Sequence, residues 1–387
     1  MILKRRYFSV HIKGNLAYAL LVHGVCFHCV FCSYNPRLTL KQDDAPLLYN
    51  RNYSHTALFH QEGSKSLIVG GINHVLHFDV DSRHLTDIAS SIQGSCENVV
   101  TVIERFEDYT FVCGTNGEQP LCWKLFPRES NHSTEVVDGT GISPHTSSQN
   151  SLSLVADGDL YAAAPLYSDG TLLQFRRKAG KRTSVWMYDQ WVSEPTFISS
   201  FLAQRKNAPL NEKLYVLFRE KNSDTSPEAD PWISRVARVC KGDHTCHFPR
   251  TRMARMVTLI YVIYLSKLSN LKNSTAVCIY SLAELDDVFE HSSFKGYSEA
   301  IPTPRPGTCV KQSNSIPIST LQIIKDHPEM KDWIQPIQKE MPFFTSNKNF
   351  TKIAIDRVQA SDDSMHNVLL LATGILACDV MVQMSTY

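Results

Sequence analysis

The sequence predicts an all-β fold. Three observations lead to it: short apolar or alternating segments recur along most of the chain, turns rich in Gly, Asn and Asp separate them, and only residues 282–290 show a helical pattern. Strands of this kind build a sandwich, a barrel or a propeller. A chain of 387 residues is long enough for one large repeat domain or two to three ordinary domains. No clean internal repeat is visible, so blades of a propeller would have to be divergent.

The N-terminal segment has the pattern of an export signal. It is basic, it has no acidic residue before Asp43, and residues 15–32 form an apolar run followed by polar residues. These features predict a signal peptide over residues 1–32 and an exported remainder, 33–387. The basic residues are Lys4, Arg5, Arg6 and Lys13.

A metal site is the alternative for this segment. Cys26, Cys29 and Cys32 follow the CxxCxxC spacing with His28 inside it, which can ligate zinc or an iron–sulfur cluster. Because no second ligand cluster follows, we favour export and expect no metal and no cofactor. Four Asn-X-Ser/Thr triplets become glycan acceptors in an exported chain: Asn52, Asn131, Asn273 and Asn349.

The strands can be assigned in order along the chain. Residues 66–71 and 74–80 are apolar segments joined by a Gly-Ile-Asn turn, and residues 153–163 form a hairpin around Asp157-Gly158. The alternating or apolar segments that follow are residues 213–220, 233–240, 256–265, 274–281, 352–360 and 366–374. The run from residue 256 to 265 is too short to span a bilayer, so we assign it to a strand.

Cys113 and Cys122 flank a short Gly-Thr-Asn loop. Three interpretations are open: a disulfide, half of a metal site, or two buried thiols. In the oxidising compartment that the export signal predicts, a disulfide joining the two strands of a hairpin is favoured.

Composition and motifs argue for a binding protein rather than an enzyme. Lys and Arg number 39 against 38 acidic residues, which gives no reason to expect a nucleic-acid partner. The chain has no HExxH, GxSxG, P-loop or GxGxxG motif, and nothing indicates a small-molecule substrate. Residues 168–175 are faintly similar to a sialidase Asp-box, but a polar turn before a strand explains them much better. A secreted glycan-processing propeller is therefore a remote alternative.

Ordered segments of the chain resemble the semaphorin domain: VCGTNGEQPLC (112–122), WVSEPTFISSF (191–201), LYVLFRE (214–220), ISRVARVCKGD (233–243), STAVCIYSLAELDDVF (274–289) and PRPGTC (304–309). Others are similar to class 7, GPI-anchored semaphorins: HTALFHQEGSKSLIVGG (55–71), CENVVTVIERFEDYTFVCGTN (96–116), SSFKGYSEAIPTPRPGTC (292–309) and DRVQAS (356–361). The resemblance covers residues from about 56 to about 372, and it implies that residues 33–387 form one sema domain with roughly blades 1 to 6. It implies a seven-bladed β-propeller and an extracellular ligand that regulates axon guidance, cell migration, adhesion and immune signalling. The implied receptors are a plexin and, in class 7, a β1 integrin.

The resemblance also implies roles for particular residues. Cys113 would bond Cys122, and Cys240 would bond Cys309, closing a loop of roughly 70 residues whose closure stabilises the fold by ~4 kcal/mol. Lys241, Gly242 and Asp243 stand where class 7 semaphorins have the integrin-recognition tripeptide Arg-Gly-Asp. Lys keeps the charge of Arg but lacks its planar guanidinium group. The alternative interpretation of Lys241, Gly242 and Asp243 is a solvated turn.

The chain departs from the semaphorin pattern in three places. Cys96 lacks the second cysteine of a family pair. The region 244–270 is shorter than in the family, which leaves Cys278 without its usual partner and makes Cys246 a candidate substitute. The sequence ends after what resembles the sixth blade, so we expect a propeller that is incomplete at its C-terminal end, with unpaired strand edges. It shows no membrane span or GPI signal, and we expect an extracellular or secreted protein.

The resemblance places plexin recognition on the middle blades, here residues 160–250. A mixture of basic and aromatic side chains there suits an interface: Arg176, Arg177, Lys178, Trp186, Tyr188 and Trp191, with Trp191 favoured as a core residue. A receptor-type sema domain and a non-signalling truncated isoform are the alternatives to a ligand. The sequence leaves open whether the chain forms a homodimer.

Overall fold

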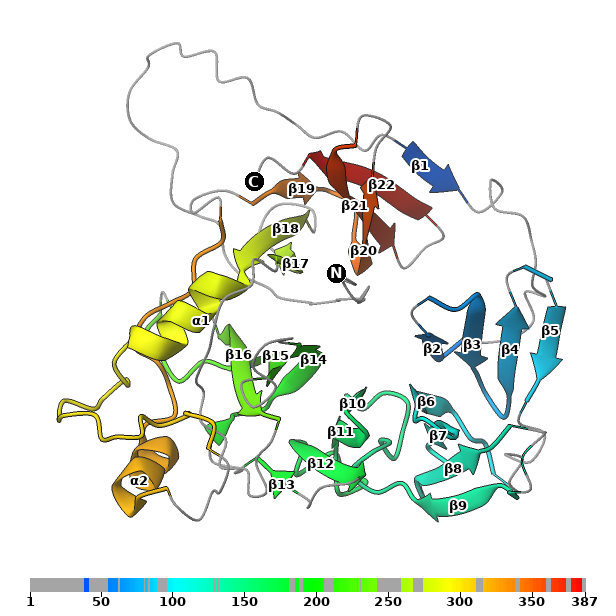
Figure 1. The fold of residues 1–387 in the computed structure, drawn as a ribbon, viewed down its shortest axis with the longest axis horizontal. Coiled ribbons are helices and arrows are strands. Elements are labelled where there is room, and N and C mark those ends of the chain that lie inside the picture. Colours follow the sequence, from blue (N-terminus) through cyan, green and yellow to red (C-terminus); the bar gives the residue numbers. More distant parts are fainter. Residues whose placement is uncertain are drawn as a thin grey trace, which may run out of the picture.

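The structure is a computed structural model. It describes residues 38–41, 55–241, 259–266, 274–373 and 377–384, apart from short gaps within 55–241 and 274–373. In these residues the chain forms six antiparallel sheets arranged around a ring, as the blades of a β-propeller are (Figure 1). The all-β prediction is therefore confirmed.

The first three sheets are each a four-stranded meander. Their strands run in chain order: β2 (Ala57–His60), β3 (Ser66–Gly70), β4 (Val75–Asp79) and β5 (His84–Asp87), then β6 (Val100–Arg105), β7 (Thr110–Gly114), β8 (Leu121–Leu125) and β9 (Glu135–Asp138), then β10 (Leu152–Ala156), β11 (Asp159–Ala164), β12 (Gln174–Gly180) and β13 (Val185–Trp186). The predicted hairpin at Asp157-Gly158 joins β10 to β11. Both turn residues have positive φ, 54° and 78°, as a two-residue hairpin turn requires.

The remaining sheets contain the longer strands. The fourth consists of β14 (Thr196–Ala203), β15 (Lys213–Lys221) and β16 (Trp232–Cys240), and the fifth of β17 (Leu259–Ser266), β18 (Ser274–Ser281) and β19 (Phe344–Ser346). The sixth contains β20 (Phe350–Gln359), β21 (Met365–Thr373), β22 (Ala377–Met384) and β1 (Leu38–Lys41). Strands were predicted in the positions of β15 to β18, β20 and β21.

Between β18 and β19 the chain leaves the sheet and forms two helices, α1 (Leu282–His291) and α2 (Ile318–Asp326). The helical pattern of residues 282–290 predicted α1, whereas α2 was not predicted. Ser281 caps α1 by accepting a hydrogen bond from the Glu284 amide. The buried face of α1, formed by Leu282, Leu285 and Phe289, packs against Phe201 and Tyr215 of the fourth sheet.

The core lies between the faces of neighbouring sheets. Ile68 and Val75 of the first sheet pack on Val100 and Trp123 of the second, and the fifth and sixth sheets meet at Ile279 and Leu369. Burial of each large aliphatic side chain stabilises the fold by about 1.5–3 kcal/mol. Phe175 of the third sheet likewise packs against Phe197 of the fourth, with ring centroids 6.2 Å apart.

Partly buried polar side chains connect adjacent sheets. The Asn150 side chain accepts a hydrogen bond from the Phe197 amide and donates one to the Phe197 carbonyl, both 2.8 Å, and so joins the third sheet to the fourth. The Glu104 carboxylate accepts from the Ser153 hydroxyl at 2.8 Å and from the Val155 amide at 3.1 Å, which joins the second sheet to the third. These contacts fix the sheets relative to one another.

The first strand of the chain completes the last sheet. β1 pairs with β22 in antiparallel register, with Leu38 opposite Val380 and Lys41 opposite Ala377 (Figure 1). The outer edge of β22 is therefore paired, contrary to the expectation that an incomplete propeller leaves this edge open. Pairing satisfies backbone groups that would otherwise be available to a neighbouring chain.

Candidate functional site

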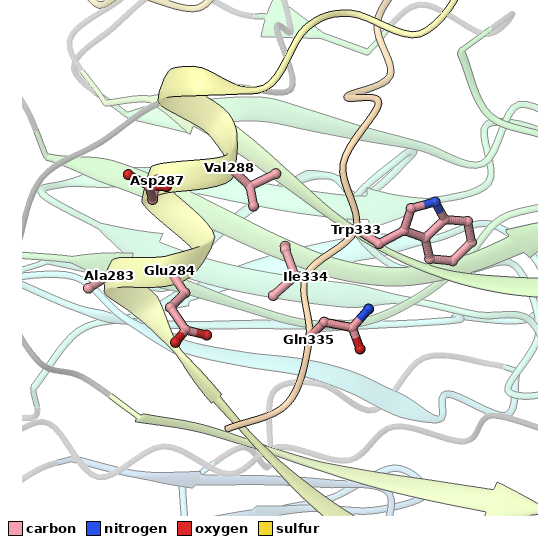
Figure 2. Close-up of a pocket in the computed structure, with 7 residues that line it drawn as sticks. All are labelled: Ala283, Glu284, Asp287, Val288, Trp333, Ile334 and Gln335. Atoms are coloured by element: carbon pink, nitrogen blue, oxygen red, sulfur yellow. The ribbon is translucent and has the colours of Figure 1, made fainter. Parts of the chain in front are cut away.

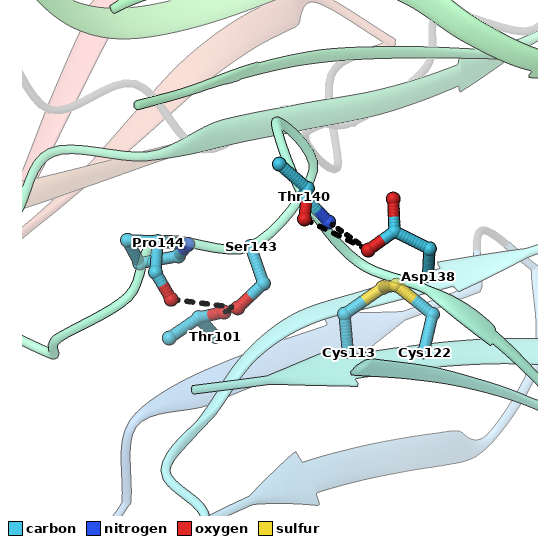
Figure 3. The surroundings of a disulfide bond; sticks show 7 residues. All are labelled: Thr101, Cys113, Cys122, Asp138, Thr140, Ser143 and Pro144. Carbon is cyan, nitrogen blue, oxygen red and sulfur yellow. Dashed lines mark hydrogen bonds between the residues drawn. A yellow bond between two sulfur atoms is a disulfide. The ribbon is translucent and has the colours of Figure 1, made fainter. Parts of the chain in front are cut away.

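The structure contains the disulfide between Cys113 and Cys122 (Figure 3). Cys113 of β7 lies directly opposite Cys122 of β8, with 4.0 Å between their Cα atoms, and both side chains are fully buried. The turn between these strands holds Asn116, Gly117 and Glu118 at positive φ, which brings the two strands into register. The bond lies in the core between the second and third sheets and has a structural role.

Polar contacts surround this disulfide on the loop that leaves β9. The Asp138 carboxylate accepts hydrogen bonds from the Thr140 amide at 3.1 Å and hydroxyl at 2.8 Å (Figure 3). The hydroxyls of Thr101 and Ser143 lie 2.7 Å apart and connect the same loop to the inner strand β6. The loop is thus held in place by its own side chains.

The second disulfide joins Cys240 to Cys309, with 5.6 Å between the Cα atoms and a sequence separation of 69. It connects the end of β16 to the segment between α1 and α2. The fourth sheet and this inserted segment are therefore covalently connected.

Lys241 follows Cys240 directly and is tied to the propeller. Its ammonium donates hydrogen bonds to the carboxylates of Glu212 and Asp157, the latter at 3.1 Å. Burial lowers the pKa of Lys241, but the hydrogen bonds to Glu212 and Asp157 outweigh it and the net pKa is raised. Gly242 and Asp243 lie outside the described residues, so the structure places only the first residue of the tripeptide.

Cys278 lies in β18 and is buried. It is not disulfide-bonded in the structure, and burial raises the pKa of its thiol to about 11. Cys246 lies outside the described residues. The pairing of Cys246 with Cys278 therefore stays a prediction.

Of the four glycan acceptors, Asn349 is described and exposed, immediately before the buried Phe350 of β20. A glycan on Asn349 would project into solvent without disturbing the strand. The other three acceptors, Asn52, Asn131 and Asn273, lie outside the described residues, as does the predicted signal peptide. These modifications stay predictions.

The basic pair on β12 does not form a charged rim, and this part of the expected interface is wrong. Arg176 and Arg177 are only 6% and 1% exposed. The Arg176 guanidinium donates to the carbonyls of Ala164 at 3.0 Å and Leu172 at 2.8 Å, while Arg177 lies over the Tyr161 ring. Both arginines satisfy backbone and aromatic groups inside the third sheet.

The neighbouring residues of that set differ in their roles. Lys178 is half-buried, and burial lowers its pKa although Asp138 acts in the opposite direction. Trp191 packs against the core between the third and fourth sheets and donates its indole N–H to the Lys325 carbonyl at 3.1 Å. The assignment of Trp191 to the core is therefore confirmed. The side chains of Trp186 and Tyr188 lie outside the described residues.

A different set of side chains gathers at one end of the fourth sheet, and we call Glu194, Arg219, Lys221 and Trp232 the fourth-sheet patch. Glu194 and Lys221 are exposed, and Arg219 and Trp232 are partly buried. The Lys221 ammonium bonds the Glu194 carboxylate at 2.7 Å, and the Arg219 guanidinium lies 4.7 Å from the centre of the Trp232 ring. Strand pairing brings them together, because Lys221 lies opposite Trp232 in the register of β15 and β16. Sequence patterning missed this patch because the pairing of β15 with β16 and the contact with Glu194, rather than the order of residues along the chain, bring the four side chains together.

The hairpin loop that follows Lys221 extends the patch. Its described residues between 222 and 231 are mostly exposed, and the Asp224 carboxylate accepts a hydrogen bond from the Ser226 amide at 2.9 Å. This bond is the main cause that lowers the pKa of Asp224. Tyr167, 56% exposed, lies in the loop between β11 and β12 of the neighbouring third sheet. Charged groups beside exposed aromatic rings are the composition of a protein-binding surface rather than of a catalytic site.

No described helix is long and apolar enough to cross a membrane. Within the same described residues, no group of three or more His, Cys, Asp or Glu is placed to hold a metal ion.

Comparison with known proteins agrees with the fold. The Sema domain family matches residues 243–375. The chain is 31% identical to human Semaphorin-7A over 370 residues, covering 84% of this chain and 54% of that protein, and 32% identical to the mouse Semaphorin-7A over 364 residues. The chain thus spans about half the length of the curated relatives it matches.

Solved structures give the same fold. Drosophila Semaphorin 2a superposes with a TM-score of 0.67 at 18% identity, covering 91% of this chain and 69% of that one. A structure of Drosophila Plexin A in complex with Semaphorin 1b superposes with a TM-score of 0.65 at 20% identity, covering 88% of this chain and 75% of the matched one. The ring of sheets is therefore a sema-type propeller. The chain belongs to the semaphorin family.

Proposed function

We propose that this chain is an extracellular semaphorin ligand that binds a plexin through the fourth-sheet patch and the hairpin loop beside it. The observation that carries the proposal is the mixed charged and aromatic composition of this patch, with Glu194 and Lys221 exposed, on a sema-type propeller. A semaphorin of the same fold is known in complex with a plexin, which supports the choice of partner. Binding rather than chemistry would then transmit the signal for guidance, migration, adhesion or immune regulation.

The test is binding of the secreted chain to plexin ectodomains. Lys221→Glu reverses a charge in the patch and should weaken binding at least about tenfold if the patch is central. Lys65→Glu is the matched control, because Lys65 also forms an exposed surface ion pair, with Asp81 in the first-sheet region. Equal binding by the two variants would contradict the placement of the interface.

We propose in addition that the tripeptide at 241–243 binds a β1 integrin. The anchoring of Lys241 by Glu212 and Asp157 supports a fixed starting point for the loop that carries Asp243. The Asp243 carboxylate would complete the coordination of the metal of the integrin. Asp243→Ala should abolish cell adhesion through β1 integrin and leave plexin binding intact, and Asp243→Glu serves as the control that keeps the charge. If adhesion survives Asp243→Ala, the tripeptide is a turn and does not bind the integrin.

A further inference from the structure

A groove lies beside α1, on the segment inserted between β18 and β19 (Figure 2). Its volume is about 420 Å³, and it runs between α1 and residues 333–335. Val288 of α1 and Ile334 of the facing segment give it apolar walls, and the polar side chains of Glu284 and Gln335 lie together at one end. The size is that of a site for one or two side chains of a ligand.

Both walls of the groove are held by contacts that face away from it. Behind α1, the buried carboxylate of Asp286 forms an ion pair with Arg238 of β16, 2.9 Å apart. Opposite, the Asp332 amide donates to the Ser292 hydroxyl at 2.9 Å, and the Ile337 amide donates to the Ile279 carbonyl at 2.8 Å. A ligand would therefore meet a preformed site and would not bear the cost of ordering it.

Trp333 stands at the edge of this groove with 67% of its surface exposed. Among the described residues its indole makes no hydrogen bond and no ring contact, unlike that of Trp191, which packs in the core and bonds the Lys325 carbonyl. The fold therefore does not use the Trp333 side chain for packing. An exposed Trp beside a preformed groove is typical of the central anchor of a protein interface.

The negative charge of the groove favours a partner with basic side chains. α1 carries four carboxylates and no Lys or Arg. Asp286 is neutralised by Arg238, but Glu284 and Asp287 line the groove, and the Asp287 side chain is 71% exposed, with the neighbouring exposed His291 as its partner at 2.9 Å. A cation on a long apolar stem complements such a site, because its stem covers apolar side chains while its head group stays with the carboxylates.

We propose that this groove binds a basic segment of a second protein partner, with Trp333 as the anchor. Lys or Arg stems of the segment lie over Val288 and Ile334, and their cations reach Glu284 and Asp287. None of these residues belongs to the fourth-sheet patch, so the chain can engage this partner through a separate surface.

The probe is a fluorescein-labelled ten-residue peptide of alternating arginine and leucine, compared by fluorescence polarisation with a peptide of the same length that has glutamate in place of arginine. The basic peptide should bind the full chain, and the acidic peptide should not. Trp333→Ala should weaken binding of the basic peptide at least about tenfold. The double variant Glu284→Gln, Asp287→Asn should weaken it several-fold and flatten its dependence on salt.

Matched controls keep the test specific. Ile318→Ala removes an exposed apolar side chain on α2 that is 75% exposed, and the double variant Asp81→Asn, Glu135→Gln removes two surface charges elsewhere. Both controls should bind as the unmodified chain does, and thermal unfolding should show that every variant is folded. Equal weakening by the controls, or unchanged binding by Trp333→Ala, would overturn the proposal. Sedimentation that shows self-association lost only in Trp333→Ala would overturn it as well, because the occupant would then be a second copy of the chain.

Discussion

Asp286 and Asp287 are adjacent in sequence but lie in opposite environments. Asp286 faces the fourth sheet, where its carboxylate accepts from the guanidinium of Arg238 at 2.9 Å and from the Tyr215 hydroxyl. Arg238 is fully buried and also lies 4.6 Å from the centre of the Phe289 ring. A buried ion pair of this kind adds little over a well-packed apolar pair, but the loss of one partner leaves the other charge buried without compensation.

Asp286→Ala should therefore lower the free energy of unfolding by roughly 3–5 kcal/mol. Asp287→Ala, one position along and 71% exposed, should change it by no more than about 0.5 kcal/mol. Urea unfolding followed by fluorescence measures both. Similar values for the two variants would show that α1 is not anchored through Asp286.

Cys278 allows a pH-dependent prediction. Burial raises the pKa of its thiol to about 11, so its thiolate is scarce near neutral pH and iodoacetamide should alkylate it far more slowly in the folded chain than in urea. The folded pKa lies above the unfolded value, so the stability contributed by the neutral thiol is present below the unfolded pKa. It is lost as the pH rises through about 11. Mass spectrometry of alkylated peptides measures the rates.

The same experiment tests the pairing with Cys246. A Cys278 that resists alkylation in urea without a reductant, and reacts once a reductant is added, is disulfide-bonded. Rapid alkylation of Cys278 in the folded chain at neutral pH would instead contradict its burial.

At the scale of elements, the strands were predictable from short apolar segments between turns. Residues 213–220 and 233–240 lie in β15 and β16, and β15 is buried on both faces, with one face packed on the third sheet and the other on α1. The sequence of a single strand does not show which distant segments lie beside it, so the fourth-sheet patch was not predicted. The helix α2 was not predicted either. Arg176 and Arg177 were misassigned to the surface because charge normally indicates exposure, and only the fold supplies the carbonyls and the ring that receive them.

The two disulfides connect elements over very different lengths of chain. Cys113 and Cys122 are 9 positions apart and Cys240 and Cys309 are 69 apart. Chain entropy predicts that replacing the second pair by serines lowers the free energy of unfolding by roughly 4 kcal/mol, against roughly 2.5 kcal/mol for the first pair. Urea unfolding of the two double variants under oxidising conditions provides the comparison. The reverse order would show that local burial of Cys113 and Cys122, rather than loop length, governs their contribution.

At the scale of the whole molecule, the first strand of the chain is held in the last sheet by four residue pairs between β1 and β22. Deletion of residues 38–41 should expose the outer edge of β22, lower the melting temperature and raise light scattering on heating. The double variant Thr39→Ala, Leu40→Ala, which keeps the backbone hydrogen bonds, is the control and should stay closer to the unmodified chain. Identical melting of the deleted and intact chains would mean that β1 does not contribute to the closed state.

The direction of the β1–β22 pairing has a mechanical consequence. Because Leu38 lies opposite Val380 and Lys41 opposite Ala377, the segment before β1 and the end of β22 leave the pair on the same side. A tensile force applied through these two ends would load the hydrogen bonds one after another, like the opening of a zipper, instead of loading them all at once in shear. Under tension the ring should open first at β1, at a low force and before any blade unfolds.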